Sequence, residues 1–297
     1  MYLRAFLWAT FVGSLFLLVG SFGASLHPVA DSIAVFRYWI ALVSMVSVAL
    51  LVHGALRLSA LAIFAMALVA QPVVERLYLS RAQQDFAYSL YQKNMLYENT
   101  ALVPLAQDIR AVGADFVTLQ EVSRANVQAY LDLAPDFAAA TKCDRLHTSS
   151  LAILSKYPRT STPVLCPQDA SGILAMQVQT PDGPLWIVNI HLRWPWPYAQ
   201  PENLTKIVPI LQTLQGPIVV GGDFNAVPWS GALRQVEQAT GALRMGPGYK
   251  TYLGPYPFFN LPIDHVLAAP GNGRGRVETR PLLGSDHLGL WARFNLP

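Results

Sequence analysis

Charged residues are scarce in this sequence of 297 residues. Lys, Arg, Asp and Glu make up 13% of it, about half of the roughly 25% that is usual in soluble proteins. Of its 21 basic and 18 acidic residues, five and two lie before residue 82, which leaves 16 of each in residues 82–297. The larger part is therefore formally neutral, and the pI near 8.9 does not by itself indicate a nucleic-acid-binding protein.

Cysteine is also scarce, because only Cys143 and Cys166 occur, 23 residues apart. The paired thiolates and closely spaced histidines of a zinc site are absent, and this excludes that class of metal site. Two interpretations of the cysteines remain open. They are buried free thiols, or they form one disulfide, which would suit an oxidising periplasm or exterior.

Long apolar runs are abundant before residue 82. Three of them, at about 5–26, 33–53 and 58–74, approach the roughly 20 residues of a membrane-spanning helix. The sequence predicts a membrane anchor over residues 1–81, with three transmembrane helices and a polar stalk. The alternatives are buried core helices, or a cleaved signal peptide for the first run.

The basic residues give a modest indication of orientation. Arg4 and Arg57 fit the cytoplasmic side, whereas Arg76 and Arg81 oppose that arrangement. We therefore expect an integral protein of a bacterial inner membrane, with its C-terminal domain in the periplasm and its N-terminal helices in contact with the lipid bilayer.

Residues 82–297 show a different pattern, in which short β-forming runs alternate with helical periodicity. Strands are expected at 88–95, 115–119, 151–155, 174–179, 185–190, 218–220, 263–267 and 288–294, and helices at 102–112, 124–133 and 204–214. The mixed order predicts a layered α/β domain with some antiparallel pairing.

Several of these strands end in polar side chains. In "VVGGDFNA", Asp223 and Asn225 are two residues apart, so extended backbone would place them on one face. Taken singly, each polar residue has a structural explanation, such as a turn, a cap or a core histidine. The full set is Asn94, Glu121, His191, Asp223, Asn225, Asp264, Asp286 and His287.

The motifs "KNM", "TLQEV", "AILSKYP", "VNIHL", "VVGGDFNA", "IDHVL" and "SDHLGL" occur in this order. Together they resemble the endonuclease/exonuclease/phosphatase superfamily over about residues 88–294. The resemblance implies an α/β fold of the α+β type. It is a four-layer sandwich of two mixed β-sheets flanked by helices, here in residues 82–297 and preceded by the three transmembrane helices.

The resemblance also implies a metal side of the site. Asn94 and Glu121 match the positions that hold a divalent ion, and Asp286 completes them. Oxygen ligands of this kind suit Mg²⁺ or Mn²⁺.

Five residues match catalytic positions. Asp223 and Asn225 match the pair that positions the attacking water and the phosphoryl oxygens. His287 matches the histidine that contacts the phosphate, Asp264 the carboxylate that orients it, and His191 a histidine that binds phosphate or helps the leaving group. Either Asp223 or His287 could be the general base, and Asp223 is favoured.

The predicted function is hydrolysis of a phosphoester, with a nuclease-type phosphodiesterase first. The alternatives are a phospholipid or phosphoinositide phosphatase or phosphodiesterase of the sphingomyelinase kind, and an inactive membrane scaffold. The substrate would be a nucleic acid or a lipid headgroup.

The segment "RWPWPYAQP" after His191 suggests an aromatic lip for surface packing, base stacking or an interfacial belt. A second segment of interest lies just before "SDH" and contains Arg274, Arg276 and Arg280. This second basic patch could attract phosphates, or it is an exposed loop with scattered arginines. The family often has Gly-Asn or a similar small pair before "AILS", in a loop that borders the substrate in relatives, whereas this chain has Ser149-Ser150 there.

Overall fold

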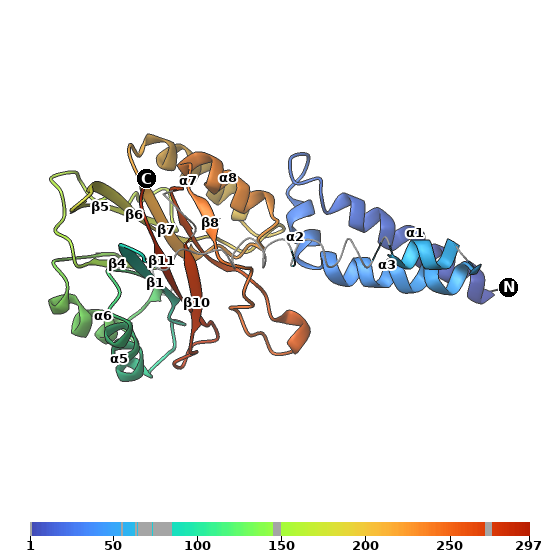
Figure 1. The fold of residues 1–297 in the computed structure, drawn as a ribbon, viewed down its shortest axis with the longest axis horizontal. Coiled ribbons are helices and arrows are strands. Elements are labelled where there is room, and N and C mark those ends of the chain that lie inside the picture. Colours follow the sequence, from blue (N-terminus) through green and yellow to red (C-terminus); the bar gives the residue numbers. More distant parts are fainter. Residues whose placement is uncertain are drawn as a thin grey trace.

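The computed structural model of the chain describes residues 2–54, 56–62, 64, 73, 85–144, 150–270 and 275–297. Two β-sheets lie face to face with helices outside them, and an N-terminal pair of long helices projects from one end (Figure 1).

The first sheet has six strands in the order β10-β11-β1-β2-β4-β3. In chain order its strands are β1 (Tyr88–Asn94), β2 (Phe116–Val122), β3 (Ala139–Cys143), β4 (Ser150–Ser155), β10 (Arg276–Arg280) and β11 (Gly289–Phe294). Strands β1 and β2 are parallel and the other pairs are antiparallel, so the sheet is mixed.

The second sheet has five strands in the order β5-β6-β7-β9-β8. Its strands are β5 (Ile173–Thr180), β6 (Gly183–His191), β7 (Ile218–Asp223), β8 (Leu243–Met245) and β9 (Asp264–Ala268). Only β6 and β7 are parallel here, so this sheet is also mixed.

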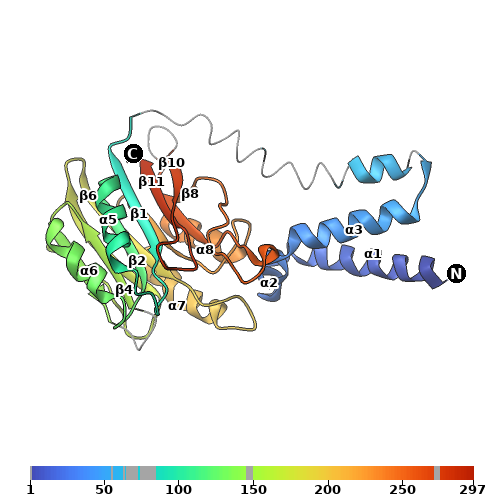
Figure 2. The ribbon, with the colours of Figure 1, turned by 90° about the horizontal axis from the view of Figure 1, so that it is seen from below.

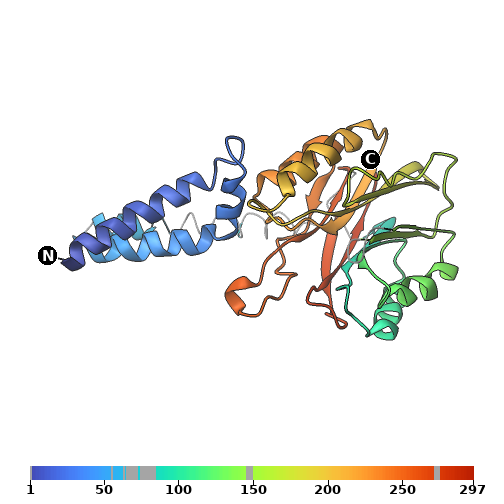
Figure 3. The same cartoon turned by 180° about the vertical axis from the view of Figure 1, so that it is seen from behind.

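Both faces of each sheet are buried, which explains the near-continuous apolar strands. In β6, Leu185 and Ile187 face the core between the sheets, whereas Trp186 and Val188 face the outer helices. The outer layers are α5 (Leu102–Val112) and α6 (Val127–Leu133) on the first sheet, and α7 (Gln200–Thr213) and α8 (Gly231–Thr240) on the second. The predicted four-layer sandwich is confirmed, and Figure 3 shows it from behind.

The N-terminal region contains α1 (Tyr2–Gly20), α2 (Val29–Val35) and α3 (Arg37–Leu51). Helices α1 and α3 lie side by side, with a Ser44–Ser14 hydroxyl contact of 2.7 Å between them, and the short α2 sits next to the sandwich (Figure 2). Small residues of this kind allow helices to approach closely in an apolar setting.

The prediction of three transmembrane helices is not borne out in the described residues. Helix α1 is long and apolar enough to cross a membrane, and α2 with α3 would count as a second span only if their 69° bend were included. Helix α2 contacts the α8 region of the sandwich, whereas α3 continues away from it. The predicted third span, 58–74, and the stalk that follows lie mostly outside the described residues.

Candidate active site

The predicted site residues come from strand ends that meet at one end of the sandwich. His191 ends β6 and Asp223 ends the parallel strand β7, and the two are in register. Asp264 begins β9, which is antiparallel to β7, so it pairs directly with Asp223. Asn94 ends β1 in the facing sheet. The topology therefore brings residues from distant parts of the sequence to a common edge.

Asp264, His287 and Asp223 form a buried line of charges. His287 Nδ1 is 2.7 Å from Asp264 Oδ2, and its Nε2 is 3.8 Å from Asp223 Oδ2. Burial alone would lower the pKa of His287, but the carboxylates of Asp264 and Asp223 outweigh it and raise this pKa to about 10. His287 is therefore an imidazolium at neutral pH.

The two carboxylates of this line have opposite shifts. Burial raises the pKa of Asp223 to about 6, although the imidazoles of His287 and His191 favour its charged form. Burial also acts on Asp264, but the charge and hydrogen bond of His287 outweigh it and lower the pKa of Asp264. Asp264 is thus the permanent anion that holds the imidazole, while Asp223 can exchange a proton near neutral pH.

A chain of buried amides fixes which atoms face Asp264. Both hydrogens of the Asn189 amide are donated to backbone carbonyls of neighbouring strands, so its oxygen accepts from Gln120 Nε2 at 2.6 Å. Gln120 then presents its oxygen to Gln92 Nε2 at 2.9 Å, and the same Nε2 donates to Asp264 Oδ1 at 2.8 Å. Gln92 therefore donates to one oxygen of Asp264 and His287 donates to the other. Both oxygens must be hydrogen-bond acceptors, as they are in a carboxylate.

Glu121, Asn94 and His191 form the other half of the site. Asn94 Nδ2 lies 3.1 Å from Glu121 Oε1 and 3.0 Å from Asp223 Oδ2. His191 Nε2 lies 3.8 Å from Glu121 Oε1 and 3.7 Å from Asp223 Oδ2. Glu121 has a left-handed φ of 55° at a register shift in β2. This strained conformation turns its carboxylate into the site.

Asp286 and His287 are carried by a loop that Lys93 holds in place. The fully buried Lys93 ammonium donates to the carbonyls of Pro281, Leu282 and His287. Burial lowers the pKa of Lys93 to about 8, against the attraction of nearby carboxylates. Asp286 is half-buried, with its Oδ1 4.0 Å from His287 Nε2.

Asn225 contacts the site through its backbone. Its N–H donates to Asp223 Oδ1 at 2.9 Å, and its side-chain amide donates to the Leu192 carbonyl at 2.9 Å. In this arrangement Asn225 orients Asp223. The glycines before it are required by space, because a Cβ on Gly222 would lie 2.0 Å from the Ile190 carbonyl oxygen.

The oxygen atoms of the site are suitable ligands for a divalent cation. The imidazolium of His287 compensates one carboxylate of the site, while Glu121, Asp223 and Asp286 leave an excess of negative charge with oxygen ligands. Atoms of Asp223, Asp264 and His287 also lie within 4.8 Å of one another. That trio is less suited to a metal, because His287 Nδ1 is already hydrogen-bonded to Asp264.

Sequence reasoning assigned no role to Gln92, Gln120, Asn189, Lys93 or Tyr252. A signal was present for two of them, because Gln92 and Asn189 each lie two residues before a strand-end site residue and so share its face. Tyr252 pairs with His287 in an isolated bridge, and their rings are 5.2 Å apart.

The aromatic lip lies beside the site, and its rings pack against other elements. Trp194 contacts Tyr252 at a ring separation of 6.0 Å, and Trp196 contacts His27 at 5.9 Å. Both tryptophans remain over 40% exposed. They therefore connect the site with the N-terminal helices.

The second basic patch is engaged in ion pairs where it is described. Arg276 pairs with Glu278 at 3.1 Å, and Arg280 pairs with Asp108. Arg274 and Ser149 lie outside the described residues.

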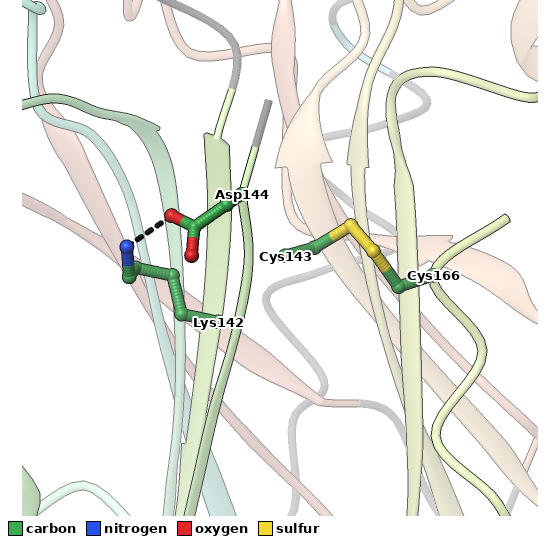
Figure 4. Close-up of a disulfide and its surroundings, with 4 residues drawn as sticks. All are labelled: Lys142, Cys143, Asp144 and Cys166. Atoms are coloured by element: carbon green, nitrogen blue, oxygen red, sulfur yellow. Dashed lines mark hydrogen bonds and ion pairs between the residues drawn. A yellow bond between two sulfur atoms is a disulfide. The ribbon is translucent and has the colours of Figure 1, made fainter. Parts of the chain in front are cut away.

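The two cysteines are joined. Cys143 at the end of β3 and Cys166 form a disulfide with a Cα separation of 5.8 Å, next to the Lys142–Asp144 ion pair (Figure 4). Of the two interpretations of the sequence, the disulfide is the one that the structure supports.

The two-sheet fold and the family that the sequence matches define a hydrolase that acts on ester bonds. The sequence model of the endonuclease/exonuclease/phosphatase family matches residues 92–287, and the chain belongs to this family. A search of curated proteins by sequence found no match. Family membership makes the chain an ester-bond hydrolase.

Solved structures show the same fold at low identity. An endonuclease/exonuclease/phosphatase from Beutenbergia cavernae is 20% identical, over 71% of this chain and 72% of its own, with a TM-score of 0.51. The 3′ phosphatase NExo from Neisseria, bound to product DNA hairpin, is 17% identical over 70% and 99%, with a TM-score of 0.52. Beta toxin from Staphylococcus aureus, with bound magnesium ions, is 12% identical over 70% and 99%, with a TM-score of 0.52.

Proposed function

We propose that the chain hydrolyses a phosphoester with the help of a divalent cation, Mg²⁺ or Mn²⁺. The observation that carries this proposal is the convergence of His191, His287 and Asn94 on the buried carboxylate of Asp223, at 3.0–3.8 Å. Such a carboxylate, surrounded by donors that can contact a phosphoryl group, has the composition that attack by water on phosphorus requires.

The cation would be held by Glu121 and Asp286 and by the Asn94 oxygen. Asn94 would have to turn its amide, because its NH₂ group now faces Glu121 and Asp223. Bound there, a divalent ion neutralises charge on the phosphoryl oxygens and on the leaving oxygen. The beta toxin neighbour carries magnesium, which is consistent with this choice of ion.

We assign the general base to Asp223. His287 is held protonated by Asp264, so it is a donor to a phosphoryl oxygen and not a base. Asp223 has a pKa near 6, close to the optimum for accepting a proton from water at neutral pH. Asn225 orients Asp223, and His191 is placed to contact the phosphate or the leaving group.

The proposal includes a division of the chain at about residue 81. Residues 1–81 would anchor the protein in a membrane through α1, and residues 82–297 would form the catalytic domain. A disulfide persists in oxidising compartments, so the Cys143–Cys166 bond favours a periplasmic catalytic domain.

Hydrolysis is tested with the full chain in detergent and methyl p-nitrophenyl phosphate as substrate. We expect turnover with Mg²⁺ or Mn²⁺, none with EDTA, and a loss of at least about 100-fold in kcat for Asp223→Asn. Asp115→Asn is the matched control, since Asp115 accepts hydrogen bonds from Ser89 and lies at the starting ends of β1 and β2. No metal-dependent turnover by the wild type would sink the proposal and favour an inactive scaffold, whereas equal turnover by the wild type and Asp223→Asn would refute the role of Asp223.

A further inference from the structure

An apolar cavity of about 380 Å³ lies between α2 and the end of the sandwich that carries the site. Its volume is within the range of about 300–1,000 Å³ that is usual for small-molecule sites. The N-terminal segment contributes Ser32, Val35 and Phe36, and the catalytic part contributes Trp194, Tyr252 and Leu261 among others. No charged residue lines it within the part of the chain that the structure describes.

One wall of the cavity is continuous with the catalytic centre. The Tyr252 ring lies 5.2 Å from the His287 ring, and the backbones of the two residues are paired. Trp194, three residues after His191, packs against Tyr252 at 6.0 Å. None of the predicted site residues lines the cavity itself, so Tyr252 and Trp194 form the boundary between a molecule in the cavity and a phosphoester bound at His287.

The opposite wall is α2, which joins the two long N-terminal helices (Figure 2). Its attachment to the catalytic part is specific. The Asp31 carboxylate accepts hydrogen bonds from the N–H groups of Gly231 at 2.6 Å and Ala232 at 3.0 Å, at the start of α8. Trp229 Nε1 donates to the Ala34 carbonyl at 2.8 Å. These contacts fix the cavity between the site and the apolar helices.

We propose that this cavity holds the alkyl chain of a membrane lipid whose phosphoester lies in the catalytic site. The proposal deepens the proposed function and rests on it. An alkyl chain matches an uncharged cavity, because burial of apolar surface provides the binding energy and no polar group is left unpaired. The cavity lies where α1, if it spans a bilayer, ends, so a lipid could reach it without leaving the membrane interface.

The exposed aromatic residues at the rim agree with this occupant. Trp194, Trp196 and Tyr198 are 41–66% exposed beside the cavity. Aromatic side chains of this kind concentrate at membrane–water interfaces. A nucleic acid would instead require a basic surface, and Arg276 and Arg280 are already paired with acidic residues.

A homologous series of alkyl p-nitrophenyl phosphates tests the cavity, with the full chain in detergent. The methyl member reports phosphoester hydrolysis alone, and the butyl, hexyl and octyl members add only apolar length. We expect kcat/KM to rise with chain length by up to about fourfold per methylene. Turnover of the methyl ester with no dependence on length would overturn the cavity proposal and leave the proposed function intact.

Val35→Phe narrows the cavity from the α2 side and is expected to flatten the length dependence. Val43→Phe is the matched control, because Val43 is exposed on α3 and does not line the cavity. A length dependence that Val35→Phe leaves unchanged would overturn the proposal, since partition into micelles would then explain it.

A second measurement does not depend on catalysis. The wild type in phosphatidylglycerol nanodiscs, with a trace of a phospholipid that carries a diazirine on its acyl chain, is irradiated and digested. We expect labelling of peptides that contain residues 194–198 or 252–261. Labelling without turnover of any ester would reject the proposed function while the cavity remained a lipid site. Absence of labelling there would overturn the cavity.

Discussion

Replacing Asp264 by Asn isolates the role of the buried charge line. The substitution keeps the shape of the side chain and removes one negative charge 2.7 Å from His287 Nδ1. The Asn amide has one acceptor, yet two donors face this position, because the amide chain from Asn189 presents Gln92 Nε2 to it. One buried donor must therefore face an NH₂ group in the variant, at a cost of about 1–3 kcal/mol.

The larger effect is on the charge of His287. In the wild type its pKa of about 10 keeps the imidazole protonated at pH 8. Without the Asp264 carboxylate, only Asp223 and Asp286 still oppose burial, and the pKa of His287 falls from about 10 toward the ordinary 6.5. At pH 8 only about 3% of His287 would then be protonated, a loss of roughly 30-fold from protonation alone. With the misplaced donor added, kcat should fall about 100- to 1,000-fold.

The assay is the pH–rate profile for methyl p-nitrophenyl phosphate with saturating metal. The active form needs His287 protonated, so activity disappears as pH rises through the pKa of His287. The alkaline limb of Asp264→Asn should therefore move to lower pH, and the defect should be smaller at pH 6 than at pH 8. Asp115→Asn should keep the wild-type profile. A variant Asp264→Asn with the wild-type alkaline limb and activity within threefold would refute the assignment of His287 as a protonated donor.

Three further outcomes concern stability in detergent. Gly222→Ala should lower the free energy of unfolding by about 1–3 kcal/mol, because its Cβ meets the Ile190 backbone, whereas Gly13→Ala, with open space around it, should not; circular dichroism on heating measures both. Burial lowers the pKa of His265 to about 4, so its contribution is present above the unfolded value of 6.5 and is lost as pH falls toward 4, with a slope of about 1.4 kcal/mol per pH unit. Because the raised pKa of Asp223 acts in the opposite direction in this range, the test is the difference between the wild type and His265→Gln, and a pH slope of Tm that His265→Gln leaves unchanged contradicts this. Asp31→Ala removes the carboxylate at the start of α8 and should cost about 1–2 kcal/mol; an unchanged Tm in the same thermal unfolding contradicts this.

Two of the strand ends could be predicted because His191 and Asp223 interrupt runs of mainly apolar, β-forming residues. Asn94 follows Gln92 and Lys93 and was recognised from its motif, and the helix expected at 102–112 is α5 itself. The alternation of side chains along a strand predicts which face of the sheet each residue occupies. The order of the family motifs predicts that these residues meet at one edge. The short strands β3 and β8 were missed, since three to five residues give too little periodicity to recognise. Helix α8 was missed although Ala232, Leu233 and Val236 have helical spacing and Ser230 caps its start.

The amide chain behind Asp264 depends on contacts that sequence spacing does not contain. Gln92, Gln120 and Asn189 lie on three strands of two sheets, and their hydrogen bonds exist only once the sheets are stacked. The same holds for α2. Its residues 33–35 read as part of an apolar span, and only the Asp31 and Ala34 contacts with the α8 region show that this turn belongs against the catalytic part.

The docking of α2 bears on the kind of substrate. A flexible stalk would be sufficient to keep a hydrolase near a membrane, and it would leave the site free to face any direction. Here Asp31, Ala34 and Ser32 bond to the start of α8, to Trp229 and to the Trp196 carbonyl, so the site has one orientation relative to the long helices. A fixed orientation is useful when the substrate always arrives from the same side, as a lipid in a bilayer does, and brings no advantage for a nucleic acid that diffuses in from solution. Under the proposed membrane anchor, the docking of α2 therefore favours the proposed lipid substrate, in agreement with the cavity that α2 lines.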